Sequence, residues 1–228
     1  MPYKIALIGT GGRSLSYAAA YQKHDDITIT ALADPNASHR HTMAKRAGLT
    51  DDYAEYDDWR DMLREQTELD GTVICSPNHL HADQTELALQ MGKHVLLELP
   101  MGLTLAESQR VAEREEETGL VCMVCHTNRF NNAFREIHRM VHSGELRLHH
   151  IVQQTYFFRR TNENRFGRPR TWADDLLWHQ ACHMVDMVFW ILGDAQMKAW
   201  GQAGPEHPTL GIPMDVSIGL RSQVGCLV

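Results

Sequence analysis

A glycine-rich turn near the start of the chain has the spacing of a phosphate-binding loop. The apolar run Ile5–Ile8 leads into a G-x-G-x-x-S pattern and then into an Ala-rich, helix-forming segment. Gly9 would permit a tight turn, Gly11 would let the backbone approach a pyrophosphate, and the small Ser14 would let the helix pack close to its strand. A purely structural turn is the alternative for a G-x-G alone. The candidate cofactor-binding residues of this turn are Gly9, Gly11, Gly12, Arg13 and Ser14.

An acidic residue, Asp34, ends the second apolar run, Ile27–Ala33, twenty positions after Ser14. A carboxylate at this place accepts hydrogen bonds from an adenosine ribose hydroxyl. A 2′-phosphate about 4 Å away would be repelled by about 4 kcal/mol per charge pair at an effective dielectric constant of about 20. Asp34 therefore favours NAD over NADP, although Arg40 is near enough in sequence to swing in and compensate.

Two histidines, an aspartate and a tryptophan recur at helical spacing in the second half of the chain. His179, His183, Asp186 and Trp190 stand at i, i+4, i+7 and i+11, which places them on one face of a helix. A neutral imidazole, with an ordinary pKa near about 6.5, suits a general base at neutral pH. We expect His183 to take a hydroxyl proton while the substrate's carbinol hydride moves to a nicotinamide, and His179 to orient or share that proton.

Two other interpretations of the histidine pair stay open. Both side chains can be satisfied core or surface groups, or the H-x-x-x-H spacing can ligate zinc. The sequence from His179 to His183 lacks the Glu of H-E-x-x-H, and no obvious third ligand follows. We therefore assign no metal.

Arginines concentrate between residues 159 and 170, although the chain as a whole is acidic. Guanidinium groups pair bidentately with carboxylates, so this excess predicts a small-molecule carboxylate substrate, and a solvated basic loop is the alternative. The arginines are Arg159, Arg160, Arg165, Arg168 and Arg170, against the single acid Glu163. Arg129 is a further candidate for a substrate carboxylate, and two aromatic residues are candidates for walls of the site. The substrate-binding candidates are Arg129, Tyr156, Arg160, Arg170, Trp178 and Asp186.

Short apolar runs alternate with amphipathic segments up to Cys125, which predicts a doubly wound parallel α/β sheet over residues 1–125. The predicted helices, Ala82–Met91 and Leu105–Glu117, are each followed by a glycine suited to a left-handed C-cap. The predicted strands are Ile5–Ile8, Ile27–Ala33, Val73–Cys75, Val95–Leu97 and Leu120–Cys125. The C-x-x-C spacing in the last run indicates core residues of an apolar strand, not a redox or metal site.

Residues 126–228 follow a different pattern and predict a second α/β domain with an open, mainly antiparallel sheet. We expect helices at Asn132–His142 and from about Asp174 to Leu192, the latter capped by Thr171, Asp174 or Asp175. The expected strands are Ile151–Arg160 and Val216–Leu220. Gly225–Val228 resembles the start of a further strand, so this domain is expected to be incomplete at its C-terminus.

Composition excludes several classes of protein. With 22 Lys+Arg, 29 Asp+Glu and 43% hydrophobic residues, the chain has a formal charge of −7 and a globular composition, which excludes disorder, collagen and coiled coil. The acidic balance argues against a nucleic-acid partner. No apolar run approaches the roughly 20 residues of a membrane helix, and the start leaves no room for a signal peptide. The cysteines predict reduced thiols and a cytoplasmic protein.

Two motifs carry a resemblance to a known family. Ile74–His81 (ICSPNHLH) and Gly92–Pro100 (GKHVLLELP) resemble signatures of the glucose-fructose oxidoreductase / inositol dehydrogenase / rhizopine-catabolism (Gfo/Idh/MocA) family. The resemblance implies an N-terminal Rossmann domain, and a C-terminal sheet whose face binds substrate and often another subunit, hence a homo-oligomer. It also adds cofactor-binding candidates: Ser76, Pro77, Asn78, His81, Glu98 and Pro100.

The second half is similar to one branch of that family, on the stretches 118–124, 154–160 and 177–183. That branch acts on 4-carboxy-2-hydroxymuconate semialdehyde. The similarity implies an NAD(P)-dependent oxidoreductase of aromatic catabolism, which oxidises the cyclic hemiacetal of a carboxylated semialdehyde, or a related hydroxy acid.

The sequence departs from the general family pattern at two positions. Leu99 replaces the usual Lys of the E-K-P loop, and His179 replaces an Asp four residues before His183. Loss of a preorganised donor costs about 2.7–4 kcal/mol in other enzymes. The similar branch also lacks the Lys, which favours a rebuilt site. The alternative is a catalytically impaired or truncated dinucleotide-binding protein.

Overall fold

The computed structural model describes residues 2–21, 23–50, 52–156, 161, 163, 177–194 and 196–228. The chain divides into two compact units, the first containing Met1–Cys125 and the second beginning at His126. The five arginines of the stretch from Arg159 to Arg170 lie outside the described residues.

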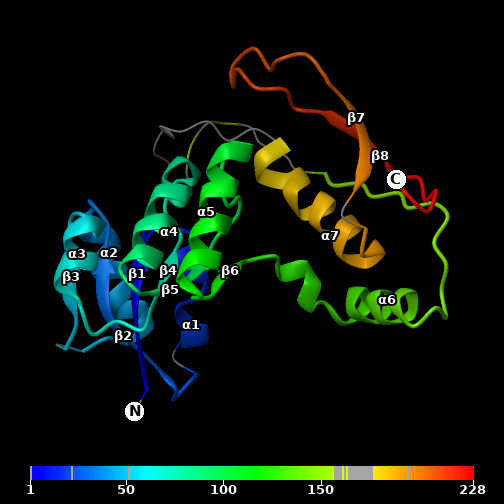
Figure 1. Ribbon diagram of the computed structural model, residues 1–228. Helices are drawn as coiled ribbons and strands as arrows, with labels where there is room; N and C mark the ends of the chain where they lie inside the picture. Colours follow the sequence, from blue (N-terminus) through cyan, green and yellow to red (C-terminus); the bar gives the residue numbers. More distant parts are fainter. Residues whose placement is uncertain are drawn as a thin grey trace. The chain divides into compact units, whose positions relative to one another are not determined.

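The first unit is built on a six-stranded parallel sheet with the strand order β3-β2-β1-β4-β5-β6 (Figure 1). This is the order of a dinucleotide-binding Rossmann domain. Its strands are β1 (Tyr3–Ile8), β2 (Ile27–Ala33), β3 (Ala54–Tyr56), β4 (Gly71–Ile74), β5 (His94–Leu97) and β6 (Cys122–Val124). Its helices are α1 (Ala18–Tyr21), α2 (Ala37–Ala47), α3 (Trp59–Glu65), α4 (His81–Gln90) and α5 (Leu105–Thr118).

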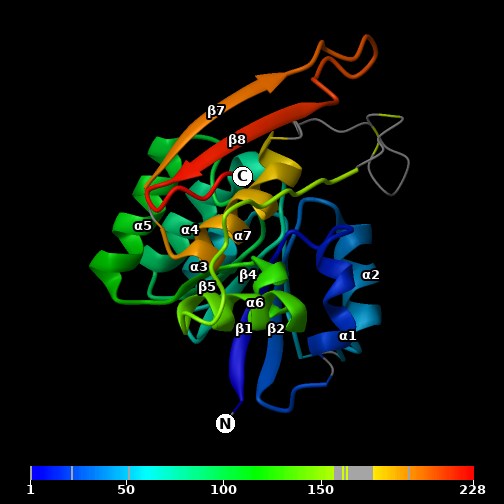
Figure 2. The same cartoon turned by 90° about the vertical axis from the view of Figure 1, so that its right-hand side faces the viewer.

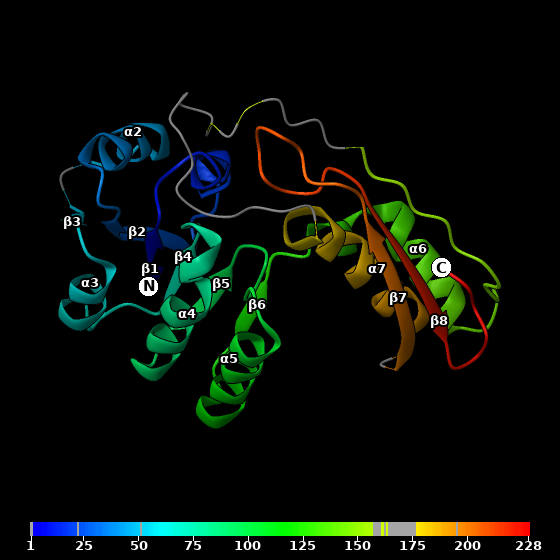
Figure 3. The same ribbon diagram turned by 90° about the horizontal axis from the view of Figure 1, so that it is seen from above.

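Two apolar layers hold the helices against the sheet. On one face, Met43 and Ala44 of α2 pack with Leu7 and Leu32 of the central strands. On the other face, helices α3 and α4 contribute a second set of buried side chains, which includes Leu63 and Leu89. Figure 3 shows α2 on one side of the sheet and α3 and α4 on the other. Coverage of both faces explains why these strands read as continuous apolar runs.

Both predicted helices of the first unit are confirmed. Their observed first and last residues differ from the predicted ones by at most one position. Helix α5 begins with a capping box, in which Thr104 Oγ1 accepts from Glu107 N–H and the Glu107 carboxylate accepts from Thr104 N–H. Gly119 ends it with φ 64°. The predicted helix after the glycine turn is shorter than expected, because a 3-10 turn at Ser14–Ser16 precedes the four residues of α1.

The second unit contains helix α6 (Asn132–His142), helix α7 (Cys182–Leu192) and two antiparallel strands, β7 (Met197–Ala203) and β8 (Val216–Ser222). Figure 2 shows the two strands side by side as arrows that point in opposite directions. Beyond β8 the chain turns back, and the backbones of Val228 and Leu220 exchange hydrogen bonds of 2.9 and 3.0 Å. The fold class expected from the sequence is confirmed: a parallel Rossmann sheet, followed by a unit with an antiparallel sheet.

Two expectations for the second unit need correction. Residues 151–156 of the predicted strand Ile151–Arg160 have no regular structure, and only His150 forms an isolated bridge, with Leu227. A strand needs a neighbour along its length, and the backbone bond from the Ile151 N–H to the Leu227 carbonyl joins this stretch only to a short C-terminal segment. The helix predicted after Asp174 is described from Leu177 onward. Its first described turn, Leu177–Ala181, is π-helical. Its candidate caps lie outside the described residues.

None of the described helices is long and apolar enough to cross a membrane.

Candidate functional site

The glycine turn after β1 has the geometry that its sequence predicts. Gly9 has φ +80°, and a Cβ there would stand 2.6 Å from the backbone nitrogen of Ser76. Gly9 therefore has to be glycine for two independent reasons, conformation and space. A Cβ at Gly11 would meet no atom within 4 Å. The open surface at Gly11 is what a pyrophosphate approaching the backbone needs, so the turn fits a dinucleotide.

Asp34 follows β2 with its carboxylate fixed by the backbone around it. Oδ2 accepts from the N–H of Thr10 at 2.9 Å, and Oδ1 accepts from the N–H of Asn36 at 2.9 Å. Asn36 in turn caps α2 by accepting from the Ser38 N–H. The glycine turn and the start of α2 thus hold the carboxylate in one orientation, as a ribose-binding acid requires.

The sequence allowed Arg40 to swing in beside Asp34, but in the structure its side chain is already bound to other groups. The Arg40 guanidinium is buried and forms ion pairs with Glu55 and Asp57, and it donates to the Asp34 backbone carbonyl.

The predicted residues Arg13 and Glu98 come together through a contact that the sequence did not reveal. Arg13 Nε donates to Glu98 Oε1 at 2.7 Å, and the Tyr17 hydroxyl donates to the same oxygen. Burial and the hydrogen bond to Glu98 raise the pKa of Tyr17 above its ordinary range. Tyr17 was missed, and the available signal was an aromatic residue three positions after Ser14, where a helix-forming segment begins.

The motif after β4 is joined to the loop after β5 by His81. The imidazole is fully buried, with Nδ1 2.7 Å from the Pro100 carbonyl oxygen and Nε2 3.0 Å from the Ser76 carbonyl oxygen. Burial lowers the pKa of His81, although both carbonyl contacts oppose this shift. A neutral ring donates from one nitrogen only, so one of these contacts lacks a proton. Ser76 is also anchored, since its hydroxyl donates to Gln84 Oε1 at 2.5 Å.

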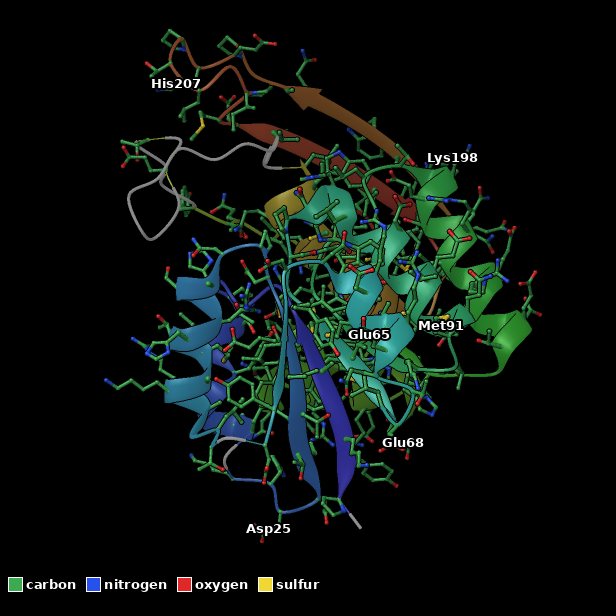
Figure 4. All side chains as sticks on the ribbon, turned by 90° about the vertical axis from the view of Figure 1, so that its left-hand side faces the viewer. Asp25, Glu65, Glu68, Met91, Lys198 and His207 are labelled. Carbon is green, nitrogen blue, oxygen red and sulfur yellow. The ribbon has the colours of Figure 1, made fainter. Side chains whose placement is uncertain are left out.

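These groups gather at one edge of the parallel sheet. Gly9, Asp34, Cys75 and Glu98 directly follow β1, β2, β4 and β5, so all lie at the carboxyl ends of the strands. In Figure 4, Asp25 labels the opposite edge, where β2 begins. Ligands of doubly wound sheets bind at the carboxyl edge, near the point where the strand order reverses. Here that point lies between β1 and β4.

The second unit holds a separate cluster of charged and imidazole groups. Arg129 binds the Asp186 carboxylate bidentately, with Nε 2.9 Å from Oδ2 and with Nη2 on Oδ1. His126 Nδ1 lies 3.3 Å from Asp186 Oδ2. Burial lowers the pKa of His126, Asp186 opposes the shift, and the charges of Arg129 and His183 add to it. His126 was missed by the sequence analysis, although it directly follows the last strand of a Rossmann pattern, where functional residues gather.

Helix α7 presents two different faces. His183, Asp186 and Trp190 share one face, on which Asp186 meets Arg129, and Trp190 stacks on His138 with ring centroids 4.1 Å apart. The predicted stripe is therefore present from His183 onward.

Tyr156 lies on the other side of α7. It helps to line a cavity of about 430 Å³, and the α7 residues of that cavity, Met184, Val185 and Val188, point away from the face of His183. The structure does not bring Tyr156 to the histidine face.

The remaining substrate candidates are only partly described. Trp178 lies half-buried in the π-helical turn that precedes α7, and His179 belongs to the same turn, but its side chain is not described. Arg160 and Arg170 lie outside the described residues. Among the side chains that are described, no three His, Cys, Asp or Glu residues are grouped as metal ligands would be.

Comparison with known families agrees with the division of the chain. Residues 3–126 match a family described as "Oxidoreductase family, NAD-binding Rossmann fold", and residues 132–228 match "Bacterial oxidoreductases, C-terminal". The chain belongs to the Gfo/Idh/MocA oxidoreductase family. It therefore carries the NAD-binding domain of a family of nicotinamide-dependent oxidoreductases.

Among curated members of the Gfo/Idh/MocA family, the 4-carboxy-2-hydroxymuconate-6-semialdehyde dehydrogenase of a Sphingobium species is 36% identical over 224 residues. The match covers 98% of this chain and 70% of that protein. The NADP(+)-dependent scyllo-inositol 2-dehydrogenase of Bacillus subtilis is 27% identical over 122 residues, 53% of this chain and 34% of that protein. The NAD(+)-dependent scyllo-inositol 2-dehydrogenase of the same species is 29% identical over 121 residues, 52% of this chain and 33% of that protein.

Solved structures show the same fold. The WlbA dehydrogenase of Bordetella pertussis, in complex with NADH and UDP-GlcNAcA, superposes with a TM-score of 0.88 at 21% identity, over 99% of this chain and 65% of that one. The scyllo-inositol dehydrogenase of Lactobacillus casei, with bound NAD(H) and scyllo-inositol, gives a TM-score of 0.80 at 19% identity, over 100% of this chain and 68% of that one. The chain thus spans about two thirds of these structures.

Proposed function

We propose that this protein is an NAD-dependent dehydrogenase that oxidises the cyclic hemiacetal of a carboxylated semialdehyde, such as 4-carboxy-2-hydroxymuconate semialdehyde, in aromatic catabolism. The observation that carries the proposal is the 36% identity to a dehydrogenase of that substrate over 98% of the chain, which includes both units. The glycine turn and Asp34 support the coenzyme part of the proposal independently.

The proposed reaction removes two hydrogens from the hemiacetal carbinol. A dinucleotide whose pyrophosphate is held by the glycine turn would supply the nicotinamide as acceptor for the hydride of the carbinol C–H bond. His183 takes the hydroxyl proton as general base, with His179 orienting or sharing that proton, and the carbinol becomes the carbonyl of a lactone. The product of such a step is a pyrone dicarboxylate.

Substrate carboxylates need cationic partners, and Arg129 is the described candidate. Asp186 occupies Nε and Nη2 of Arg129, so Nη1 is the part of the guanidinium that a substrate carboxylate would meet. Asp186 then acts by orienting Arg129. Arg160, Arg170 and Trp178 remain part of the proposal as further substrate contacts, whereas Tyr156, on the other side of α7 from His183, is no longer part of it.

The preference for NAD rests on the Asp34 carboxylate. Two backbone N–H groups fix it in place, so it cannot turn away from a 2′-phosphate. A phosphate at that position would meet a fixed negative charge.

The test follows reduction of NAD⁺ by absorbance, with the semialdehyde as substrate. We expect turnover by the wild type, and a loss of at least about 100-fold in His183→Ala, because a positioned general base contributes roughly 10²–10⁴-fold. The exposed His41→Ala serves as the matched control and should keep the wild-type rate. A His183→Ala protein with nearly wild-type turnover would remove His183 from the mechanism.

One observation favours a second candidate, a dinucleotide-binding protein without catalysis: Leu99 stands where most of the family has a catalytic Lys. Binding of NADH together with no turnover of any carboxylated semialdehyde or hydroxy acid would support this candidate over the dehydrogenase.

We also propose that copies of the chain assemble through the sheet of the second unit. Strand β7 is exposed along most of its length, and Trp200 on it is 58% exposed. A contiguous exposed apolar patch on a sheet marks an association surface, and Trp200 would belong to such a patch. Light scattering should report a multiple of the 26.0 kDa chain mass, and Trp200→Asp should shift the particle toward the monomer.

A further inference from the structure

Arg40 is a nearly buried cation beside the residue that would bind the adenosine ribose. It lies in the first turn of α2, and only 8% of its surface is exposed. Arginine is seldom buried to this extent unless it is paired, because an uncompensated charge inside a protein is costly. The partners of Arg40 therefore decide where its guanidinium group lies.

Two acids on or next to β3 hold the guanidinium. Arg40 Nε donates to Glu55 Oε2 at 2.8 Å, and Nη1 donates to Asp57 Oδ1 at 2.6 Å. Nη1 also donates to the backbone carbonyl of Asp34. The burial of Arg40 disfavours its charge, but the hydrogen bonds and the negative charges of Glu55 and Asp57 together outweigh burial and raise the pKa of Arg40 overall.

The position of Arg40 matters because the relatives differ in coenzyme. The matched scyllo-inositol 2-dehydrogenases include one named for NADP(+) and one named for NAD(+). In Rossmann domains, an arginine near the acid of the second strand accommodates the 2′-phosphate of NADP. Arg40 is near enough to Asp34 for that role, since it already bonds the Asp34 backbone, but its Nε and Nη1 donors are held by Glu55 and Asp57.

We propose that Glu55 and Asp57 are specificity-determining residues, which hold Arg40 against β3 and so withhold from a 2′-phosphate the cation that would receive it. The inference rests on the proposed dinucleotide site of the first unit. Selection of NAD over NADP would then have a second cause besides the Asp34 carboxylate. The three negative charges of Asp34, Glu55 and Asp57 outnumber the single positive charge of Arg40. NAD, which has a free 2′-hydroxyl, needs no such cation.

The test compares NADH and NADPH binding to the full chain by nicotinamide fluorescence titration. In the wild type we expect NADPH to bind at least about tenfold more weakly, which corresponds to about 1.4 kcal/mol. In Glu55→Gln/Asp57→Asn, Arg40 is released, and the ratio of the NADPH to the NADH Kd should fall by about tenfold. The Kd for NADH itself should change little, because neither acid is expected to contact that coenzyme.

Three further variants test whether the effect belongs to Arg40. Adding Arg40→Met to the double variant should abolish the gain in NADPH affinity. Asp61→Asn is the matched control, because it removes the charge of another exposed acid that pairs with an arginine, Arg64, at 3.1 Å. Asp61→Asn should keep the wild-type ratio. The single variant Asp57→Asn removes an acid whose side chain is 80% exposed, so the fold should tolerate it, and it should shift the ratio in the same direction.

Three results would overturn the inference. The first is an unchanged ratio in Asp57→Asn and in the double variant while NADH still binds. The second is a gain that persists after Arg40→Met, which would indicate charge removal alone. The third is a wild type that binds both coenzymes equally. A wild type that binds neither coenzyme contradicts the proposed function itself, so the two failures are distinguishable.

Discussion

Gly9 and Gly11 are the same residue type two positions apart, and the structure gives them different roles. Gly9 has a left-handed backbone and lies against the Ser76 backbone, so it is required by the fold. Gly11 has open space where a side chain would begin, so the fold does not require it. The need for glycine at position 11 comes from the ligand that the turn would carry.

This difference predicts opposite results for two alanine variants. Gly9→Ala should destabilise the first unit by more than about 1–3 kcal/mol, because backbone strain is added to a clash with the Ser76 backbone. Gly11→Ala should change the stability by less than about 1 kcal/mol, since its methyl group meets nothing, and should weaken NADH binding. Chemical denaturation and a coenzyme titration measure the two effects. Equal losses of stability would contradict this assignment of roles.

The sequence pointed to single residues of the candidate site where the residue type itself limits the chemistry. The glycines and Asp34 have such types and stand at strand ends, whereas Glu98 was named through the family resemblance. Their contacts were not predictable, because no spacing rule joins Arg13 to Glu98, which stands 85 positions later. His126 was missed for a related reason: its meaning depends on Asp186, which is distant in sequence.

At the scale of elements, the start of α5 is a local structure with a measurable contribution. Its capping box satisfies backbone N–H groups that the first turn cannot satisfy itself. We predict that Thr104→Ala lowers the free energy of unfolding by about 1 kcal/mol, within the range of about 0.5–2 kcal/mol for such caps.

The control for that prediction is Glu113→Ala, in the exposed middle of the same helix, which should change the stability by less than about 0.5 kcal/mol. Denaturant unfolding of both variants provides the measurement. If the two variants lose the same stability, the capping box contributes nothing specific.

The elements that the sequence revealed are those with strong apolar patterns. Strands β1, β2 and β5 and helices α4, α5 and α6 were found close to their observed bounds. Helices α2 and α3 and strand β3 were missed, because α2 is largely polar and β3 has three residues, with Glu55 at its centre. These missed elements carry Arg40 and Glu55, and Asp57 directly follows β3, so the proposed role of these acids in coenzyme selection was also hidden. Over its described part, residues 151–156, the strand expected at Ile151–Arg160 is absent, because a strand depends on a neighbour that the local sequence does not show.

At the scale of the whole molecule, stability should depend on pH through histidines in both units. Burial lowers the pKa of His81 in the first unit and of His126 in the second. When the pH falls below the unfolded value of about 6.5, the unfolded chain binds protons that the folded chain does not, so stability decreases. We predict a falling unfolding temperature between about pH 7 and pH 5.

The variant His81→Gln should be less stable than the wild type at pH 8, because it loses the imidazole contacts, but its stability should decrease less steeply toward acid. His41→Gln is the control, since this exposed imidazole meets water in both states. Thermal unfolding across the pH range distinguishes the two variants. A His81→Gln slope equal to that of the wild type would show that His81 does not contribute to the acid sensitivity.

The central claim is that the carboxyl edge of the parallel sheet binds a nicotinamide dinucleotide. Isothermal titration of the full chain with NADH tests it most directly. The account predicts saturable heat with one coenzyme per chain, together with a stabilisation of about 2.7 kcal/mol when NADH is present at about 100 times its Kd. No heat of binding and no change in the unfolding temperature at high NADH concentration would contradict the account.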